Sequence, residues 1–170
     1  MIVHFKISQT MKRDIRKIRV YLDTSVISAL FDEKSPEMMY WTQEFCKSKK
    51  DFNIFISDVV LTEIQETPDS QLRRNMSKEI EGMNVLEIDE KAEWLSNEYV
   101  RYGAIPGKYR RDAFHIGIAT IHQIEVLLSW NYRHIVRRKT REIVRMVNAL
   151  NGYAILDIMS PPEILRGEET

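Results

Sequence analysis

The chain has little cysteine and glycine, and it has no long apolar run. Its single cysteine, Cys46, excludes a disulfide framework and a zinc site built from several cysteines. The six glycines form neither a GxGxxG nor a GxxxxGK pattern, which excludes a glycine-rich phosphate loop. No stretch approaches the roughly 18 uninterrupted apolar residues of a membrane span. The N-terminal residues also lack the apolar core of a signal peptide, so we expect a cytoplasmic protein without a membrane partner.

The chain also lacks a net charge, because its 25 basic and 25 acidic residues balance. The two signs are nevertheless separated along the chain. Residues 51–100 hold 4 Lys/Arg and 12 Asp/Glu, whereas residues 101–150 hold 10 and 3. A basic region of this kind can attract an anion even on a protein whose net charge is zero.

Three short apolar runs of strand length indicate a buried sheet. They cover residues 19–22, 53–56 and 125–128, and their apolar residues are continuous rather than alternating. This pattern is typical of strands that are buried on both faces of a parallel sheet. Two weaker runs, at residues 84–88 and 153–158, are candidates for further strands or for extensions at the sheet's edges.

Segments with helical periodicity lie between these runs. The first has Ser35 as a candidate N-cap and Pro36 in the first helical position. The alternation of strands and helices over 170 residues predicts one α/β domain, a three-layer sandwich around a central, mainly parallel sheet. We place this domain at residues 18–165, between an N-terminal arm (residues 1–17) and a tail (residues 166–170). The predicted helices cover residues 36–49, 58–66, 70–81, 89–102, 112–123 and 140–150.

Polar residues stand where an open parallel sheet binds its ligands, at the carboxyl ends of the strands. Asp23 follows the first strong run, and Ser129 and Asn131 follow the third. Glu63 lies on the helix that the second run enters, and Asp112 begins the apolar helix that precedes the third. We therefore expect these five side chains to gather at one edge of the sheet.

Carboxylates gathered at one edge favour a divalent cation. Two of them about 5 Å apart repel by roughly 3 kcal/mol at an effective dielectric constant near 20. Oxygen ligands suit Mg²⁺ or Mn²⁺, and such an ion can activate water for phosphodiester hydrolysis. A phosphatase of the haloacid-dehalogenase type is excluded, because it needs a second Asp at the position of Ser25.

Each candidate also has a simpler structural interpretation. Asp23 can be a simple N-cap of a helix that follows it, without a functional role. Glu63 can be a solvated surface charge, and Asp112 can be a first-turn acid that the helix dipole favours. We expect His115 and His134 to be hydrogen-bonded structural histidines rather than catalysts.

Four short segments, taken in order, resemble the PIN-domain family. They are DTSVIS from Asp23, SDVVLTEI with Glu63, RDAFHIGIA with Asp112, and LLSWN ending at Asn131, and the similar region covers most of the chain. The resemblance implies a metal-dependent ribonuclease, and many members of that family are VapC-type toxins of toxin–antitoxin pairs. It implies that the three acids bind Mg²⁺ or Mn²⁺, with Ser129 and Asn131 as the fourth motif. It also implies an antitoxin partner and a homodimer.

The fourth motif departs from the family pattern at Asn131, where an acid is common. An amide oxygen can coordinate a hard cation or orient a water molecule, but it adds no negative charge, and Asn is also a frequent turn residue. Three carboxylates remain, which suffice for one ion and are less favourable for two. The alternative hypothesis is therefore a catalytically weak member that binds RNA or an antitoxin.

Basic residues flank the motifs of Asp112 and Asn131 in the sequence. Their charges can neutralise phosphates and so give affinity for RNA without sequence specificity. The alternative is a solvated basic helix face that keeps the protein soluble. We expect RNA to contact Lys108, Arg110, Arg111, Arg133, Arg137, Arg138 and Arg141.

Overall fold

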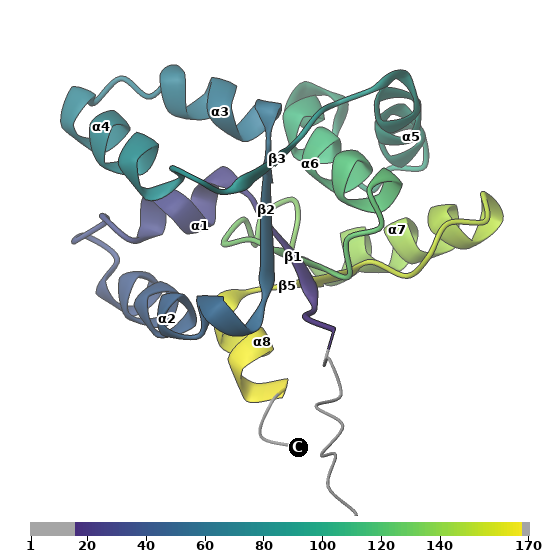
Figure 1. The fold of residues 1–170 in the computed structure, drawn as a ribbon. Helices are drawn as coiled ribbons and strands as arrows, with labels where there is room; N and C mark the ends of the chain where they lie inside the picture. The colour runs from purple at the N-terminus through teal and green to yellow at the C-terminus, as the bar shows by residue number, and fades with distance from the viewer. Residues whose placement is uncertain (1–15, 168–170) are drawn as a thin grey trace, which may run out of the picture.

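The computed structural model describes residues 16–167. Residues 1–15 of the expected arm and 168–170 of the expected tail lie outside this range. Within it, a five-stranded sheet stands between two layers of helices (Figure 1), which confirms the α/β three-layer fold. The strand order is β3-β2-β1-β4-β5, and each neighbouring pair is parallel.

The three strong apolar runs form the three central strands, as predicted, and the two weaker ones contribute the edge strands. The central position of β1 is fixed by its register, in which Val20 pairs with Ile54 on one side and with Val126 on the other. The last strand begins later than predicted, because residues 153–156 lie outside it and Ile155 is 72% exposed. The strands are β1 (Arg19–Leu22), β2 (Asn53–Ser57), β3 (Asn84–Leu86), β4 (Val126–Leu128) and β5 (Asp157–Met159).

The six predicted helices are all present, with ends within two residues of the predicted ones. Two further short helices are present, of which α1 was anticipated only through the N-cap interpretation of Asp23 and α8 was not predicted. Ser35 precedes α2 but makes no capping hydrogen bond through its side chain, whereas Pro36 does occupy the first turn. The α-helices of the described chain are α1 (Thr24–Ala29), α2 (Pro36–Lys47), α3 (Asp58–Gln65), α4 (Ser70–Glu79), α5 (Glu90–Arg101), α6 (Arg110–Ile121), α7 (Arg138–Leu150) and α8 (Pro161–Arg166), with two 3₁₀ turns, η1 (Lys49–Asp51) and η2 (Gly107–Tyr109).

The helices divide between the two faces of the sheet. In Figure 1, α1, α2, α4 and α8 lie on one side and α5, α6 and α7 on the other, while α3 follows β2 at the upper edge. The strands all run toward this upper edge, since they are parallel and β2 enters α3 there. The amino ends of α1 and α3 therefore meet at the carboxyl edge of the sheet.

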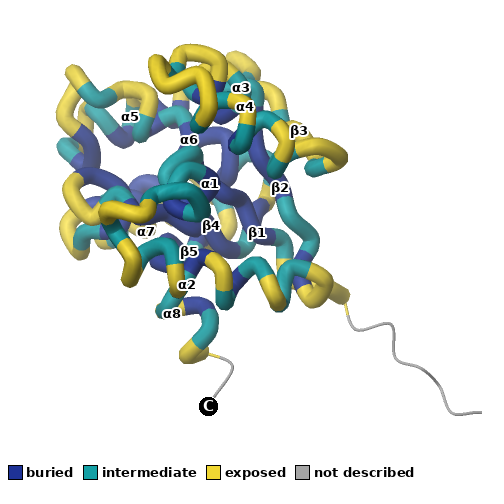
Figure 2. Tube along the Cα trace, turned by 90° about the vertical axis from the view of Figure 1, so that its left-hand side faces the viewer, coloured by how far each residue is buried: buried dark blue, intermediate teal, exposed yellow. Residues whose placement is uncertain are grey.

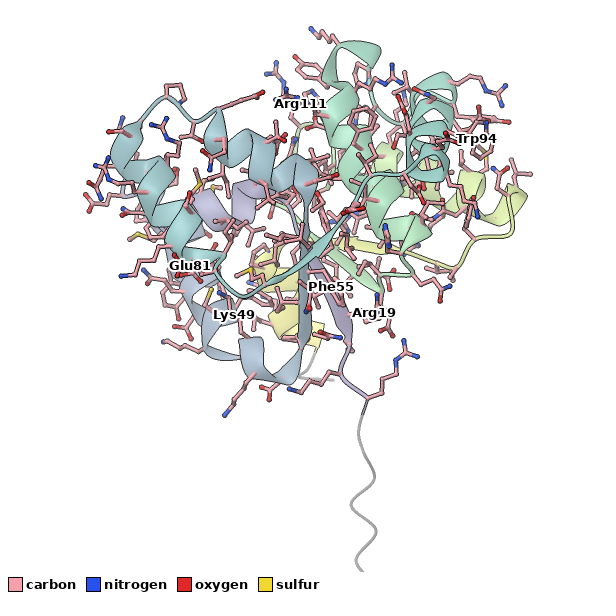
Figure 3. All side chains as sticks on the ribbon, turned by 45° about the horizontal axis from the view of Figure 1, so that its top comes forward. Arg19, Lys49, Phe55, Glu81, Trp94 and Arg111 are labelled. Carbon is pink, nitrogen blue, oxygen red and sulfur yellow. The ribbon has the colours of Figure 1, made fainter. Side chains whose placement is uncertain are left out.

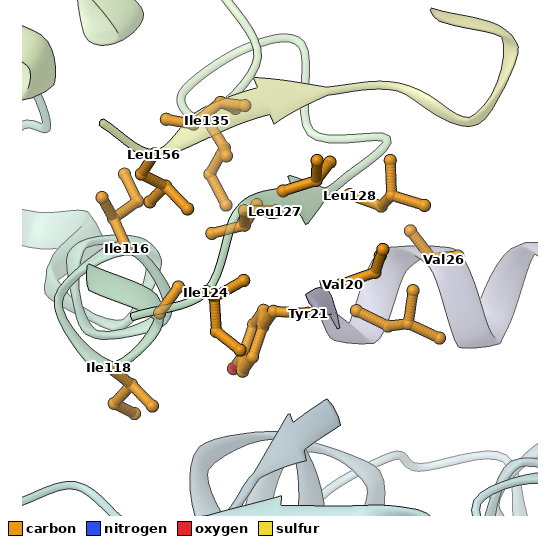
Figure 4. Close-up of a cluster of buried hydrophobic side chains, with 14 of the residues drawn as sticks. Val20, Tyr21, Val26, Ile116, Ile118, Ile124, Leu127, Leu128, Ile135 and Leu156 are labelled. Atoms are coloured by element: carbon orange, nitrogen blue, oxygen red, sulfur yellow. The ribbon is translucent and has the colours of Figure 1, made fainter. Parts of the chain in front are cut away.

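The core lies between the sheet and its helices, where Figure 2 shows the chain as buried. On the side of α6, the side chains of Tyr21, Leu127, Ile116 and Ile118 belong to one hydrophobic cluster (Figure 4), and all four are fully buried. Burial of side chains of this size contributes about 1.5–3 kcal/mol each. The Tyr21 ring thus carries a hydroxyl group into this buried layer, where Ser57 and His115 lie within hydrogen-bond distance.

Helices α5 and α6 pack unusually closely at Gly117. A Cβ atom on this glycine would lie 2.2 Å from Oγ of Ser96 and 2.7 Å from the carbonyl oxygen of Ala92. Ser96 in turn donates hydrogen bonds to the carbonyl oxygens of Ala92 and Ala113. The close contact fixes α6, which carries Asp112 in its first turn. Between residues 16 and 167, no helix has both the length and the hydrophobicity to cross a membrane.

Candidate active site

Three central strands deliver polar residues to the carboxyl edge of the sheet. Asp23 follows β1, Ser57 ends β2 and Ser129 follows β4, and all three are buried. Figure 3 shows Arg111 above this edge and Arg19, the first residue of β1, at the opposite end. The topology thus brings residues that are far apart in the sequence to one place.

Asp23 is buried and accepts hydrogen bonds on both carboxylate oxygens. It is the N-cap of α1, and its Oδ1 accepts from the backbone N–H groups of Ser25 (3.0 Å) and Val26 (3.3 Å) and from the Ser25 hydroxyl. Its Oδ2 accepts from Oγ of Ser129 at 2.6 Å. Burial raises the pKa of Asp23 above its usual value, although His115 and the two serine hydroxyls oppose the shift. The predicted N-cap role of Asp23 is therefore real, and its burial goes beyond what a cap requires.

The loop after β4 is organised by Ser129 and Asn131. Oγ of Ser129, while donating to Asp23, accepts the backbone N–H of Asn131 at 2.9 Å. The backbone N–H of Trp130 donates to Oγ of Ser25 at 2.8 Å, which joins this loop to the start of α1. The Asn131 side-chain oxygen accepts the backbone N–H of His134 at 3.0 Å, so in this structure it shapes the turn.

Glu63 is held at the same edge by two side chains. It lies on α3, where its Oε2 accepts from the Thr24 hydroxyl and from Nε2 of His115 at 3.1 Å. Its side chain is only 21% exposed, so Glu63 is not the solvated surface charge of the simpler interpretation. Burial opposes ionisation, but the hydrogen bonds from His115 and Thr24 outweigh it and lower the pKa of Glu63.

His115 connects the three acids electrostatically. It is 2% exposed and lies on α6, with Nδ1 2.7 Å from the Tyr21 hydroxyl. Burial lowers the pKa of His115, but the hydrogen bond to Glu63 and the charges of Glu63, Asp23 and Asp112 outweigh burial and raise the pKa. All three candidate carboxylates therefore act on one buried imidazole.

Asp112 contacts a second histidine, His134. Its Oδ2 lies 2.9 Å from Nδ1 of His134, and its side chain is 20% exposed. The His134 ring stacks on Tyr109 with 3.8 Å between the ring centroids. Because Asn131 bonds to the backbone of His134, the fourth motif reaches Asp112 through this histidine.

The donor chemistry of the three acids fits a hard divalent cation. Oε1 of Glu63 and Oδ1 of Asp112 accept no hydrogen bond from residues 16–167, which leaves an oxygen free on each, while Asp23 has one donor on Oδ2. Carboxylate oxygens are the ligands that Mg²⁺ and Mn²⁺ prefer. In the described part of the chain, however, no three Asp, Glu, His or Cys side chains stand close enough together to hold an ion. The carboxylate oxygens of the three acids are therefore of the type that binds such an ion. In this structure the three side chains stand farther apart than the ligands of one bound ion would.

Sequence reasoning identified the acids but not the groups that hold them. Thr24 and Ser25 directly follow Asp23, so their positions beside a candidate site were a usable signal. His115 stands three residues after Asp112, which places both on adjacent turns of one helix face. The contact of Tyr21 with His115 joins residues 94 positions apart, and nothing local in the sequence indicates it.

The predicted RNA-contacting residues fall into three groups. The first group precedes Asp112 in the sequence, with Lys108 in η2 and Arg110 and Arg111 at the start of α6. Arg111 pairs with Glu66, Arg110 approaches Glu93 and Lys108 lies over the Tyr109 ring. Arg138 pairs with Glu142 and Arg141 with Glu163, and both line a hollow of about 390 Å³ on α7. Arg137 turns inward to Thr140 and the carbonyl oxygen of Ala104.

Arg133 differs from the other arginines of this set. It is exposed in the loop between Asn131 and His134, and it makes no ion pair with any residue from 16 to 167. Its charge is therefore not offset by a carboxylate in the described part of the chain. The other arginines of the predicted set are already paired with a carboxylate or committed to backbone oxygens.

Comparison with known proteins places the chain in a family. No curated protein sequence matches it. A solved structure from Rickettsia felis, of VapBC2 bound to a DNA fragment from their promoter, is similar with a TM-score of 0.53 and 13% identity, covering 83% of this chain and 97% of the other. At this identity the similarity concerns the fold. The family model of the PIN domain matches residues 20–140, which include all three acids and the loop after β4, and the chain therefore belongs to the PIN-domain family.

Proposed function

We propose that this protein is an endoribonuclease that depends on Mg²⁺ or Mn²⁺ and hydrolyses RNA phosphodiester bonds. The observation that carries the proposal is that Asp23, Glu63 and Asp112 come to the same edge of the sheet. Glu63 is held there by Thr24, the neighbour of Asp23, and by His115, which lies on the same helix as Asp112. PIN domains are generally nucleases, and the match of the family model covers these acids. In this proposal the three acids hold the ion, while Ser129 and Asn131 fix the loop beside it.

The chain's own residues have distinct tasks in this proposal. Asp23 is held in place by hydrogen bonds from Ser25 and Ser129 in the absence of a ligand, so its side chain does not need to reorient during the reaction. Glu63 and Asp112 each keep one oxygen without a hydrogen bond from the described residues. A bound divalent cation would supply activation of water and neutralisation of charge on the phosphate. Arg133 would hold the RNA backbone beside the acids.

We further propose that the protein is the toxin of a toxin–antitoxin pair, with a small antitoxin as partner and a homodimer as its assembly. The similarity in fold to VapBC2, which was solved with its promoter DNA, supports this assignment. Co-expression with the product of a short neighbouring reading frame tests it. A stable complex that suppresses growth inhibition by the protein supports the toxin role, and growth unaffected by expression of the protein contradicts it.

Cleavage of RNA by metal-stripped protein tests the enzymatic proposal. We expect a mixed structured RNA to be cut only after Mn²⁺ or Mg²⁺ is added, and Asp112→Asn to reduce the rate by more than about 100-fold, beyond the effect typical of residues outside the ligand set. Asp51→Asn, at an exposed acid in η1, is the matched control. Cleavage that Asp112→Asn leaves unchanged comes from a contaminant and contradicts the proposal.

A second candidate function is a PIN-fold module that binds RNA or an antitoxin with little turnover. The open spacing of the acids and the use of the Asn131 oxygen within its own turn favour it. This candidate predicts salt-sensitive RNA binding without metal-dependent cleavage. The substitution Asn131→Asp distinguishes the two, because a gain of cleavage would show that turnover is limited at this position.

A further inference from the structure

A chain of hydrogen bonds crosses the core from β2 to Glu63. Oγ of Ser57 lies 2.7 Å from the Tyr21 hydroxyl, which lies 2.7 Å from Nδ1 of His115. Nε2 of His115 lies 3.1 Å from Oε2 of Glu63. Ser57, Tyr21 and His115 are each at most 2% exposed, so water does not compete for these groups.

The donors and acceptors of this chain can be assigned from Glu63. A carboxylate oxygen only accepts, so Nε2 of His115 must carry the hydrogen. In the neutral imidazole Nδ1 is then bare and accepts from the Tyr21 hydroxyl, whose oxygen accepts from the Ser57 hydroxyl. In the protonated imidazole Nδ1–H donates to Tyr21 instead, and Nε2–H still faces Glu63. Ser57 accepts in turn the backbone N–H of Val60 at 3.4 Å. With the neutral imidazole, Ser57, Tyr21 and His115 each donate one hydrogen bond and accept one, as buried polar groups require.

We propose that His115 is a positioning residue for Glu63, and that Tyr21 and Ser57 fix the imidazole so that Nε2–H faces the carboxylate. This inference rests on the proposed function, in which Glu63 is a metal ligand. By donating to Oε2, His115 and Thr24 leave Oε1 of Glu63 without a hydrogen bond from residues 16–167. Groups that orient a ligand in this way typically change metal affinity or activity by 10–100-fold when they are removed.

A matched pair of substitutions separates positioning from packing. The amide nitrogen of Gln reaches approximately where Nε2 of His lies, whereas the Asn amide reaches only the region of Nδ1. His115→Gln therefore keeps the donor to Glu63, and His115→Asn keeps a partner for Tyr21 but loses Glu63. His122→Asn, on the histidine that caps α6 and contacts the carbonyl oxygen of Glu87, controls for loss of a histidine elsewhere.

The first measurement is Mn²⁺ affinity by calorimetry on metal-stripped protein without RNA, followed by kcat and KM for RNA. We expect His115→Asn to weaken Mn²⁺ binding and lower kcat by about 10–100-fold with KM little changed. His115→Gln is expected to retain most of both, and His122→Asn to match the original protein. Equal losses in the Gln and Asn variants, or no loss in either, would overturn the inference.

Two controls keep this result apart from failure of the proposed function. If Glu63→Gln binds Mn²⁺ and cleaves RNA like the original protein, Glu63 is not a ligand and both proposals fall. If Glu63→Gln loses both properties while His115→Asn loses neither, only the inference falls.

Nitrogen-15 spectra of the His115 imidazole report which ring nitrogen carries the hydrogen, and this readout does not depend on enzymatic activity. In the original protein we expect the hydrogen on Nε2, and in Tyr21→Phe a mixture of the two tautomers. A bare Nε2 in the original protein would also overturn the inference.

Discussion

Oγ of Ser129 donates a hydrogen bond of 2.6 Å to Oδ2 of Asp23, across two adjacent strands of the sheet. The two residues are 106 positions apart in the sequence, and each follows a central strand, β4 or β1. The bond provides a donor for the carboxylate of a residue that is only 3% exposed. It also makes the geometry of the candidate site dependent on the correct pairing of β1 with β4.

Ser129→Ala should destabilise the fold. The change removes a donor to the buried Asp23 carboxylate and the acceptor of the Asn131 N–H, and an unsatisfied buried group costs about 1–3 kcal/mol. Urea unfolding at pH 7 measures this loss. Ser48→Ala, which removes a partly buried hydroxyl at the end of α2, is the control. A loss at Ser129 no greater than that at Ser48 would contradict the expected role of the bond.

The same substitution at two helix N-caps should have opposite effects. Burial raises the pKa of Asp23, so the ionised carboxylate is unfavourable there, and Asp23→Asn should raise the melting temperature at pH 7 in EDTA. Asp69 caps α4 at an exposed position, where two backbone N–H groups lower the pKa of Asp69. Asp69→Asn should therefore lower the melting temperature. A lower melting temperature for Asp23→Asn would show that its charge is well compensated.

Gly117→Ala should disrupt the contact of α5 with α6. The new Cβ would lie 2.2 Å from Oγ of Ser96, and overpacking of this kind costs about 1–3 kcal/mol. Gly107→Ala is the matched control, because its Cβ would meet only Cγ1 of Val100, at an ordinary 3.6 Å. Thermal unfolding of both variants checks the prediction. Similar melting temperatures for the two would mean that α6 shifts freely, against the packing described above.

The stability contributed by Glu163 should depend on pH. Burial opposes ionisation of Glu163, but hydrogen bonds from Arg141 and Ser160 outweigh it and lower the pKa. A lowered folded-state pKa contributes stability that is present above the unfolded pKa, about 4.3, and is lost as pH falls through the folded pKa. Glu163→Gln should melt below the original protein at pH 7, and this gap should close on acidification. A gap that is constant from pH 7 to pH 3 would exclude this charge effect.

Arg133 and Arg138 should contribute differently to RNA binding. Both are exposed, but Arg138 pairs with Glu142, whereas Arg133 has no ion-pair partner within residues 16–167. For single-stranded RNA in EDTA, Arg133→Ala should reduce the slope of log affinity against log salt by about 0.7, the value for one lost phosphate contact. Arg138→Ala should leave the slope nearly unchanged. Equal slopes in both variants would place the RNA away from the loop after β4.

The layers of the fold follow from the sequence because their signals are local and strong. The runs that form β1, β2 and β4 are continuous and apolar, and only a strand buried on both faces requires such a pattern. The extent of α1, anticipated only through its Asp23 cap, and the whole of α8 escaped prediction for physical reasons. α1 has six residues, of which Thr24, Ser25 and Ser28 are polar, and α8 begins with two prolines, so neither shows an apolar period. Their positions are determined by packing and by the Asp23 and Ser160 caps.

The candidate site was predictable as a set of acids but not as a network. Asp23, Glu63 and Asp112 stand next to recognisable strand ends and helix starts, which made them visible. The exact partners of these acids depend on tertiary contacts such as that between Tyr21 and His115. The charge count along the sequence likewise overestimated the positive charge that is free to bind RNA. Three of the predicted arginines form ion pairs in the folded protein, with Glu66, Glu142 and Glu163.

The central position of β1 has a consequence for synthesis of the protein. Among the strands of residues 16–167, β1 is made first, yet one of its two neighbours, β4, is made about a hundred residues later. At about 5–20 residues per second, the nascent chain spends several seconds with that side of β1 open. Throughout this interval Asp23 lacks Ser129, and Asp112 has not been paired with His134. An unfinished chain is therefore expected to be inert, and the activity we propose would begin only when nearly the whole domain has emerged.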